Sequence, residues 1–233
     1  MNIVITGASQ GIGKAIAEKF AANGYSLFIC SRNSANLSAL AENLRSVYPA
    51  ISVYERACDV SVKPDLQSFA DWILQKNLPV DVLVNNAGLF IPGNVFNEED
   101  GLLEEMMKVN VYSAYYLSRW LLPSMMERRN GHLFNICSIA SLKAYENGGS
   151  YSITKHAMAG ISANLRQEMM PYGIKVTSVF PGAAYTGSWS ESDIDPERLM
   201  KAEDIAGMVY MAAQLSPQAC VEEIVIRPQL GDL

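Results

Sequence analysis

The amino-acid sequence predicts one α/β domain built on a doubly wound parallel sheet of seven strands. Short runs rich in β-branched residues alternate with longer segments of helical period along the whole chain, as in strand–helix–strand crossovers. No repeat and no Pro- or Gly-rich linker divides the 233 residues, so we expect a single domain over 1–233. Hydrophobic residues make up 49% of the chain, which is enough to build a sizeable core.

In the first half of the chain the expected strands are IVIT at 3–6, SLFICS at 26–31, ISVYERAC at 51–58 and VDVLVN at 80–85. Apolar residues at helical spacing fill the intervals 12–23, 35–47 and 63–76, and Pro49 ends the second of these helices.

In the second half a long helical period at 99–128 leads to the strand HLFNICS at 132–138. Further strands are expected at 175–180 and 222–226, and further helices at 150–170 and 202–215. The stretch 183–200 lacks clear periodicity. We expect it to form a lid over a functional site, because long loops are uncommon inside compact domains.

Composition and charge exclude several classes of partner. The net charge is −6 and no cluster of five or more Lys and Arg occurs, so neither nucleic acid nor an anionic membrane is expected to bind. No apolar run approaches the roughly 20 residues of a membrane span, and the first strand begins almost at Met1, which leaves no signal peptide. The four cysteines form no CxxC pair. These features predict a cytoplasmic protein with free thiols.

Three glycines, Gly7, Gly11 and Gly13, lie in TGASQGIG between the first strand and the first helix. A tight turn there lets backbone amides approach a pyrophosphate at a helix N-terminus. The spacing differs from the general GxGxxG fingerprint, so a plain glycine-rich turn is the alternative interpretation. The position between strand and helix favours a dinucleotide site.

The end of the second strand indicates which dinucleotide binds. An acidic residue about twenty positions after the glycines would hold the ribose hydroxyls of NAD, whereas a basic residue can neutralise the extra phosphate of NADP. Ser31 and Arg32 occupy this place and offer a hydroxyl and a planar fork of donors. The alternative is a solvated surface arginine. We expect NADP(H) to be the cofactor.

Polar residues follow the third and fourth strands at the same edge of the sheet. Asp59 and Val60 come after the third, and Asn86, Ala87 and Gly88 after the fourth. Structural roles are also compatible with these residues: Asp59 would cap the next helix, and the Asn-Gly segment would be a turn.

Tyr151 and Lys155 are four residues apart on a predicted helix, so both side chains can reach one ligand. To ionise near neutral pH, a tyrosine of pKa about 10 needs a shift of about three units, roughly 4 kcal/mol. One ammonium about 4 Å away supplies roughly 1 kcal/mol in water and about 4 at an intermediate dielectric. The positive helix N-terminus and an oxidised nicotinamide would add to this. We therefore expect a site that works only with its cofactor bound.

Two further polar residues are candidates for the same site. Ser138 closes the fifth strand and could hold a carbonyl oxygen beside Tyr151, although a serine there is also a common turn cap. Asn110 lies inside the predicted helix 99–128, where asparagine has poor propensity, so something other than helix stability favours it there.

With these residues assembled, the chain resembles the short-chain dehydrogenase/reductase family from its first strand to about Thr186, and this resemblance implies a Rossmann fold. The family's glycine motif matches 6–13, its acidic adenine contact matches Asp59, its NNAG matches 85–88, and its PG…T segment matches 181–186. The expected cofactor-binding residues are Gly7, Ser9, Gly11, Ile12, Gly13, Ser31, Arg32, Asp59, Val60, Asn86, Ala87, Gly88, Tyr151, Lys155, Pro181, Gly182 and Thr186.

The resemblance also implies a mechanism, because the family's catalytic tetrad falls on Asn110, Ser138, Tyr151 and Lys155. Hydride would pass between nicotinamide and a carbonyl carbon while Tyr151 donates the proton. Lys155 would hold the nicotinamide ribose, Ser138 would orient the carbonyl, and Asn110 would position a water in the proton relay. No metal is required.

The C-terminal segment 221–233 departs from the common family pattern. It lacks the glycine-rich TGQ…VDGG ending of members that reduce acyl-carrier-protein substrates or sugars, and resembles the ending of bacterial sepiapterin-reductase-like members. Ala184 also stands where members usually carry a branched apolar residue.

The expected reaction is the NADPH-dependent reduction of a small ketone or aldehyde, planar or pterin-like, to an alcohol. Tyr145, Tyr185 and Trp189 are the candidate substrate contacts. One alternative is a 3-oxoacyl-[acyl-carrier-protein] reductase, for which Arg128 and Arg129 are the available basic residues. Another is a redox sensor that binds NADP(H) without turnover, although simple binding requires neither Tyr151 nor Lys155.

We also expect a homodimer or homotetramer, since family members pair through the two long helices at 99–128 and 150–170. The candidate interface residues are Tyr112, Tyr115, Tyr116 and Trp120.

Overall fold

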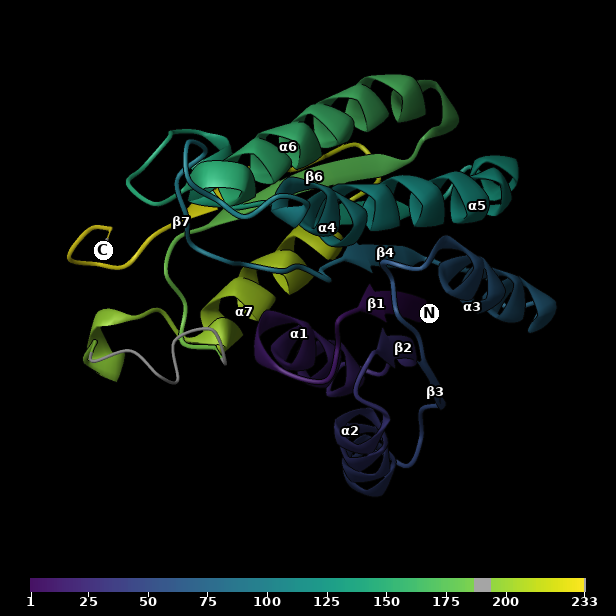
Figure 1. The fold of residues 1–233 in the computed structure, drawn as a ribbon. Helices are drawn as coiled ribbons and strands as arrows, with labels where there is room; N and C mark the ends of the chain where they lie inside the picture. Colours follow the sequence, from purple (N-terminus) through teal and green to yellow (C-terminus); the bar gives the residue numbers. More distant parts are fainter. Residues whose placement is uncertain (187–193, 233) are drawn as a thin grey trace.

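The computed structural model describes residues 1–186 and 194–232. Its strands form one parallel sheet in the order β3-β2-β1-β4-β5-β6-β7 (Figure 1). They are β1 (Asn2–Thr6), β2 (Ser26–Ser31), β3 (Val53–Ala57), β4 (Val82–Asn85), β5 (His132–Ile136), β6 (Lys175–Pro181) and β7 (Glu223–Ile226). The predicted fold class is confirmed.

The helices connect successive strands and cover both faces of the sheet. They are α1 (Gly11–Ala21), α2 (Ser34–Val47), α3 (Lys63–Gln75), α4 (Leu102–Met107), α5 (Ser113–Arg128), α6 (Gly149–Met169) and α7 (Ala202–Ala213). Shorter turns are η1 (Lys108–Tyr112), η2 (Ile139–Ser141), η3 (Met170–Tyr172) and η5 (Pro196–Arg198). Within the described residues, no helix combines the length and apolar character that a membrane span requires.

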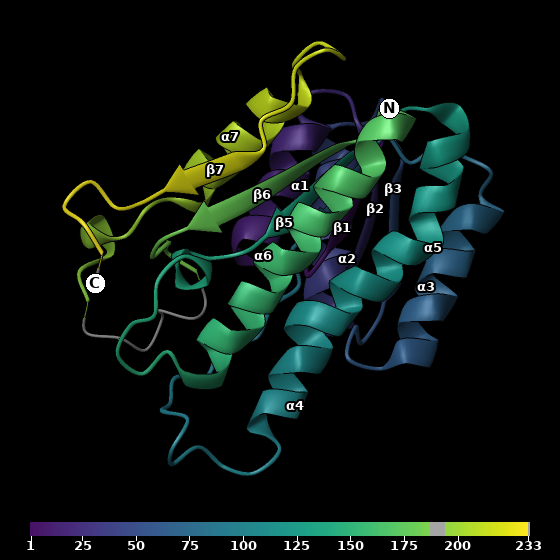
Figure 2. The same cartoon turned by 90° about the horizontal axis from the view of Figure 1, so that it is seen from above.

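The sheet separates two hydrophobic clusters, and side-chain alternation along each strand decides which cluster a residue joins. In β1, Ile3 and Ile5 pack on one face with residues of α1, α2 and α7. Val4 packs on the opposite face with residues of α3, α5 and α6. Figures 1 and 2 show these two groups of helices on opposite sides of the strands. Because both faces are covered, the central strands β1 and β4 and the neighbouring β2 are largely apolar.

The predicted helix 99–128 is wrong in two respects. It begins at Leu102, because Gly101 before it adopts a left-handed backbone with φ 93°. It also contains a π turn, η1, between α4 and α5. A π turn inserts one residue into the helical register, and such turns are frequent at functional sites. Asn110 is the central residue of this turn.

Several other elements are also shorter than predicted, among them β5, β3 and α7. β5 ends at Ile136 because the amide of Cys137 donates to Asn135 O and Val179 O, and Ser138 then caps η2. β3 begins only at Val53, since Ile51 N donates to Tyr48 O in a turn. The helix predicted to end at residue 215 ends at 213.

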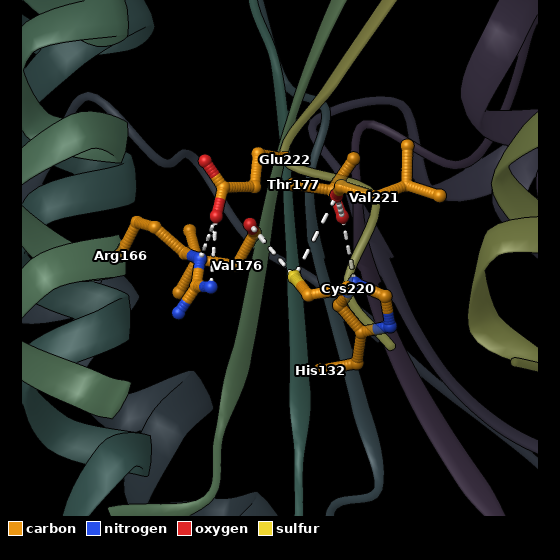
Figure 3. A network of polar contacts seen from close by, with 7 residues as sticks. All are labelled: His132, Arg166, Val176, Thr177, Cys220, Val221 and Glu222. Carbon is orange, nitrogen blue, oxygen red and sulfur yellow. Dashed lines mark hydrogen bonds and ion pairs between the residues drawn. The ribbon is translucent and has the colours of Figure 1, made fainter. Parts of the chain in front are cut away.

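A buried histidine links β5 to β6 near the amino ends of these strands (Figure 3). His132 Nε2 lies 2.7 Å from Thr177 Oγ1, and this hydroxyl donates in turn to Val221 O. The hydroxyl therefore accepts from Nε2–H, which leaves Nδ1 unprotonated. Nδ1 is buried and has no hydrogen-bond partner among the described residues. Burial, helped by the charge of Lys175, lowers the pKa of His132 to about 3.

This depressed pKa makes stability depend on pH. The unfolded chain protonates His132 below about pH 6.5, whereas the folded protein keeps it neutral down to about pH 3. We expect the free energy of unfolding to fall by on the order of 2–3 kcal/mol between pH 7 and pH 4.5 through this residue, at about 1.4 kcal/mol per pKa unit. His132→Gln should remove that part of the slope in urea unfolding, whereas His156→Gln should retain it. An unchanged slope in His132→Gln would contradict this assignment.

Candidate active site

A cleft of about 670 Å³ opens at the carboxyl ends of the strands, where ligands bind in doubly wound sheets. Most of the expected site residues line it. They are Gly7, Ser9, Gly11, Ile12, Ser31, Arg32, Val60, Asn86, Ala87, Gly88, Ser138, Tyr145, Tyr151, Lys155, Pro181, Gly182 and Thr186. Gly13, Asp59, Asn110 and Tyr185 are not among the lining residues.

The glycine segment between β1 and α1 is packed too closely for side chains. Gly7 and Gly11 have left-handed φ angles of 65° and 54°. A Cβ on Gly13 would lie 2.4 Å from both Gly7 O and Asn86 Nδ2. Asn86 Nδ2 in turn donates to Thr6 O at 2.9 Å and to Gly7 O at 3.1 Å. Because Gly13 has no side chain, the Asn86 amide can lie close to this turn and hydrogen-bond to it. Gly7 and Gly11 border the cleft.

The three residues expected to perform proton transfer lie close together. Tyr151 is in the first turn of α6, Lys155 follows one turn later, and Ser138 precedes η2 at the end of β5. Lys155 Nζ is 5.7 Å from the Tyr151 ring centroid and donates to Ile136 O at 2.9 Å. Ser138 Oγ also accepts from Ala140 N at 3.1 Å, so this serine is a turn cap as well as a cleft residue.

Burial dominates the electrostatics of these groups. It raises the pKa of Tyr151 above its usual value, although a hydrogen bond with Ser138 opposes this effect. It lowers the pKa of Lys155, with the neighbouring Cys137 acting in the opposite direction. Each side chain is therefore biased toward its neutral form. In this structure Tyr151 is suited to holding its proton.

Asn110 lies behind this group and has a structural role that the sequence did not reveal. Its Oδ1 accepts from Leu89 N at 2.6 Å, and its Nδ2 donates to Leu89 O and to Thr154 Oγ1, both at 2.9 Å. Asn110 is buried, with 2% of its surface exposed. It joins the loop after β4 to α6, which explains an asparagine inside a helix.

Comparison with known proteins agrees with this geometry. The family model for short chain dehydrogenase matches residues 1–197. The chain belongs to this family of oxidoreductases. A farnesol dehydrogenase of Aedes aegypti is 34% identical over 233 residues, which cover 97% of this chain and 94% of that protein. A sepiapterin reductase of Chlorobaculum tepidum is 30% identical over 239 residues, which cover 99% and 97%.

A solved structure shows the same fold. The alcohol dehydrogenase from the archaeon Thermococcus sibiricus, complexed with 5-hydroxy-NADP, superposes with a TM-score of 0.91 at 29% identity. The match covers 98% of this chain and 96% of that one.

The residues expected to bind the adenosine part of the cofactor differ in their hydrogen bonds. Arg32 is exposed at the cleft and makes no hydrogen bond or ion pair within the described residues, while Ser31 Oγ donates to Asn33 O at 3.1 Å. Asp59 Oδ1 accepts from the amide and hydroxyl of Ser61 at 2.9 and 2.7 Å. The alternative interpretation, in which Asp59 caps the next helix, is wrong, since Val62 holds the cap position of α3.

The substrate end of the cleft differs from expectation. Tyr145 lines it, and burial together with nearby Tyr151 raises the pKa of Tyr145 to about 12. Tyr185 is 52% exposed and is not among the residues that line the cleft, and its amide donates to Met200 O at 2.8 Å. Trp189 lies outside the described residues, as does much of the predicted lid.

The lining residues that were missed include Phe90, Lys143, Arg227 and Asp232. Phe90 packs edge-on against Tyr151, with ring centroids 4.8 Å apart. Arg227 comes directly after β7. Because ligands bind beyond the carboxyl ends of the strands, this position was a signal that could have found it. Nothing in the sequence alone placed Lys143 or Asp232 at the cleft. Among the described residues, no group of three or more His, Cys, Asp or Glu side chains is arranged to hold a metal ion.

The packing of Gly13 gives a stability test. We expect Gly13→Ala to lower the free energy of unfolding by about 1–3 kcal/mol, because its methyl group would collide with Gly7 O and Asn86. Gly160→Ala is the matched control in α6, where nothing lies within 4 Å of an added Cβ. It should raise stability by about 0.5–1 kcal/mol in urea unfolding. Equal effects of the two substitutions would refute the close packing at Gly13.

Proposed function

We propose that the chain is an NADPH-dependent reductase that converts the carbonyl of a small ketone or aldehyde to an alcohol. The observation that carries the proposal is the meeting of Ser138, Tyr151 and Lys155 in the same cleft that the glycine segment and Arg32 border. A site that only bound a dinucleotide would need the glycine segment and Arg32. It would not need Ser138, Tyr151 and Lys155 to meet there.

The cleft has features that fit NADPH. Gly7 and Gly11 leave backbone amides open beside the N-terminus of α1, which suits a pyrophosphate. Arg32 projects a guanidinium without an internal partner in the described structure, which suits the extra phosphate of NADPH. The Thermococcus sibiricus relative binds an NADP derivative on the same fold. When bound, NADPH supplies the hydride.

The protein's own residues perform the proton transfer. Tyr151 donates its proton to the carbonyl oxygen, and Ser138 Oγ holds that oxygen in place. Burial raises the pKa of Tyr151 and so keeps the phenol protonated near neutral pH, which favours reduction over oxidation. Lys155 holds the nicotinamide ribose, and it supplies positive charge beside Tyr151 once the phenol has given up its proton. Both N–H groups of the Asn110 amide are already used, so a relay water would donate to its Oδ1.

The surroundings favour a small planar substrate over a carrier protein. Phe90 and Tyr145 give the chemical end of the cleft two aromatic walls. Arg128 and Arg129 donate to Val80 O and Pro171 O, near the amino ends of the strands and away from the cleft. The carrier-protein alternative therefore loses the two arginines that were named for it. The sepiapterin reductase relative agrees with a pterin-like substrate, and segment 183–200 stays our candidate lid.

Self-association and a cytoplasmic location both stay predictions. Tyr112 and Tyr115 are exposed on the outer side of η1 and α5, as an interface requires. Tyr116 and Trp120 stack on each other and pack against the core of their own chain, so they contribute less to a partner contact than we expected.

The cofactor assignment is tested at Arg32. We expect Arg32→Ala to weaken NADPH binding by about 1.5–3 kcal/mol, the range for a hydrogen bond to a charged group, and to change NADH binding little. Fluorescence titration with each nucleotide measures both affinities, and Arg119→Ala on the exposed side of α5 is the control. Tighter binding of NADH than NADPH by the unmodified protein would show that the assignment is wrong.

The chemical assignment is tested at Tyr151 and Lys155, using NADPH consumption with a panel of diketones and quinones. Tyr151→Phe should reduce turnover to below about 1–5% while leaving NADPH affinity nearly intact, since its hydroxyl serves the proton. Lys155→Met should impair both. It should also move the pH dependence of the oxidative direction upward, because loss of a positive charge raises the phenol pKa.

Tyr172→Phe, in the distant turn η3, is the control for a lost hydroxyl. A Tyr151→Phe protein that retains most of its turnover would rule out this mechanism.

A further inference from the structure

The segment 89–98, which we name the strap, runs across the start of α6, the helix that carries Tyr151. It joins β4 to the approach to α4, and Figure 2 shows α4 and the start of α6 at the same end of the molecule. The strap begins at Leu89, which Asn110 holds by both backbone groups. Phe90 then packs on the ring of Tyr151.

The middle of the strap is attached to the loop before α6. Gly93 N donates to Asn147 O at 3.0 Å, and Gly93 forms a parallel bridge with Gly148. Asn94 Nδ2 donates to Asn147 Oδ1 at 3.0 Å. These contacts bring the far end of the strap, Glu98, to the first turn of the helix.

Glu98 holds that first turn directly. Its Oε1 accepts from Ser150 N at 2.9 Å, and its Oε2 accepts from Ser150 Oγ. Ser150 is 3% exposed and immediately precedes Tyr151. The amide of a residue in the first helical turn has no partner within the helix, so the carboxylate satisfies a group that would otherwise be unpaired.

Two glycines make room for this carboxylate. A Cβ on Gly149 would lie 1.9 Å from Glu98 Oε1. A Cβ on Gly93 would lie 2.8 Å from Glu98 Cγ and 2.9 Å from its Oε1, and the three atoms nearest to that Cβ all belong to Glu98. The collision at Gly93 therefore depends on Glu98 alone, which makes this position a specific probe.

We propose that Glu98 is a positioning residue for the reaction: by clamping Ser150 it fixes where Tyr151 meets the substrate carbonyl. The inference rests on the proposed reductase function. Because a displacement of about 1 Å at a reacting group can lower a rate by about 100-fold, a residue that touches neither substrate nor cofactor can still control turnover.

The contact between the Glu98 carboxylate and Ser150, which we name the clamp, also changes the charge around Tyr151. Lys155 faces the phenol from the same helix, Cys137 from the end of β5, and Tyr145 from the loop after η2. Glu98 adds a negative charge at the positive end of α6, which opposes phenolate formation. Removing this charge while keeping the clamp should lower the pKa of Tyr151.

Two substitutions at Glu98 separate position from charge. Glu98→Gln can accept from Ser150 N and hydrogen-bond its hydroxyl, so it keeps the clamp. We expect it to retain kcat within about 3-fold and to move the pH dependence of the oxidative direction downward by about 0.2–0.7 unit. Glu98→Ala loses both contacts. Its kcat should fall by about 10-fold or more, while its NADPH affinity changes by less than about 2-fold.

Exposed Glu99, the next residue in the chain, supplies the matched controls Glu99→Gln and Glu99→Ala, which should leave all these values unchanged. Ser150→Ala, which keeps the amide contact and loses the hydroxyl contact, should give an intermediate kcat. It serves as the test if Glu98→Ala fails to fold.

A double-mutant cycle with Gly93 tests the route of the effect. Gly93→Ala alone should lower kcat about as much as Glu98→Ala, because its methyl group displaces the carboxylate. In the Glu98→Ala background the same change should have little further effect. An equal loss in both backgrounds would overturn the proposal, as would a Glu98→Ala protein with unchanged kcat or one whose kcat and NADPH affinity fall together.

Hydrogen exchange distinguishes failure of this inference from failure of the proposed function. The amides of 149–153 should exchange faster in Glu98→Ala than in Glu99→Ala, whether or not a substrate is known. If the unmodified protein turns over no carbonyl compound but shows this difference, the reductase proposal fails and the clamp stands. If exchange is equal in the two variants, the clamp is refuted.

Discussion

The geometry of the site depends on one buried amide, the side chain of Asn110. It satisfies both backbone groups of Leu89 and the hydroxyl of Thr154, and so holds three chain segments that are distant in sequence. A buried polar group left unpaired costs about 1–3 kcal/mol, so the three segments are favoured only in this mutual arrangement. The π turn η1 supplies the amide by shifting the helical register where α4 passes into α5.

A second set of buried polar contacts fixes α6 against the sheet. Asn135 Nδ2 donates to Ser162 Oγ at 3.0 Å, and Ser178 Oγ donates to the same hydroxyl at 2.7 Å. Nearer the cleft, Lys155 Nζ donates to Ile136 O. These bonds run from one side of the helix to β5 and β6, while Glu98 holds its first turn. Helix α6 is thus fixed along its length, which sets Tyr151 and Lys155 relative to Ser138.

The sequence predicted the scaffold well, and it named candidate reacting groups that the structure brings to one cleft, because both leave local signals. Alternating strand and helix periods identified all seven strands, and YSITK after a Gly-Gly pair placed Tyr151 in a first helical turn. It could not predict contacts that depend on distant segments meeting. Glu98 reads as an ordinary loop carboxylate, and Asp232 lies 50 residues beyond Gly182, although both Asp232 and Gly182 line the cleft. Tyr185 had a suitable side chain, but it is exposed and is not among the residues that line the cleft.

The same limit applies to the electrostatics of Tyr151. An argument from charges alone counted Lys155 and the helix end as favouring phenolate, yet the largest effect in the structure is burial, which favours the neutral phenol. Burial also penalises the ammonium of Lys155. Two groups that each resist charging alone can still charge as a pair, since each then stabilises its neighbour. In the mechanism that we propose, the proton stays on Tyr151 until a reacting oxygen takes it, and Lys155 stabilises the phenolate that remains. Under that proposal the buried pair works as a proton donor first and as a base only when more positive charge is present.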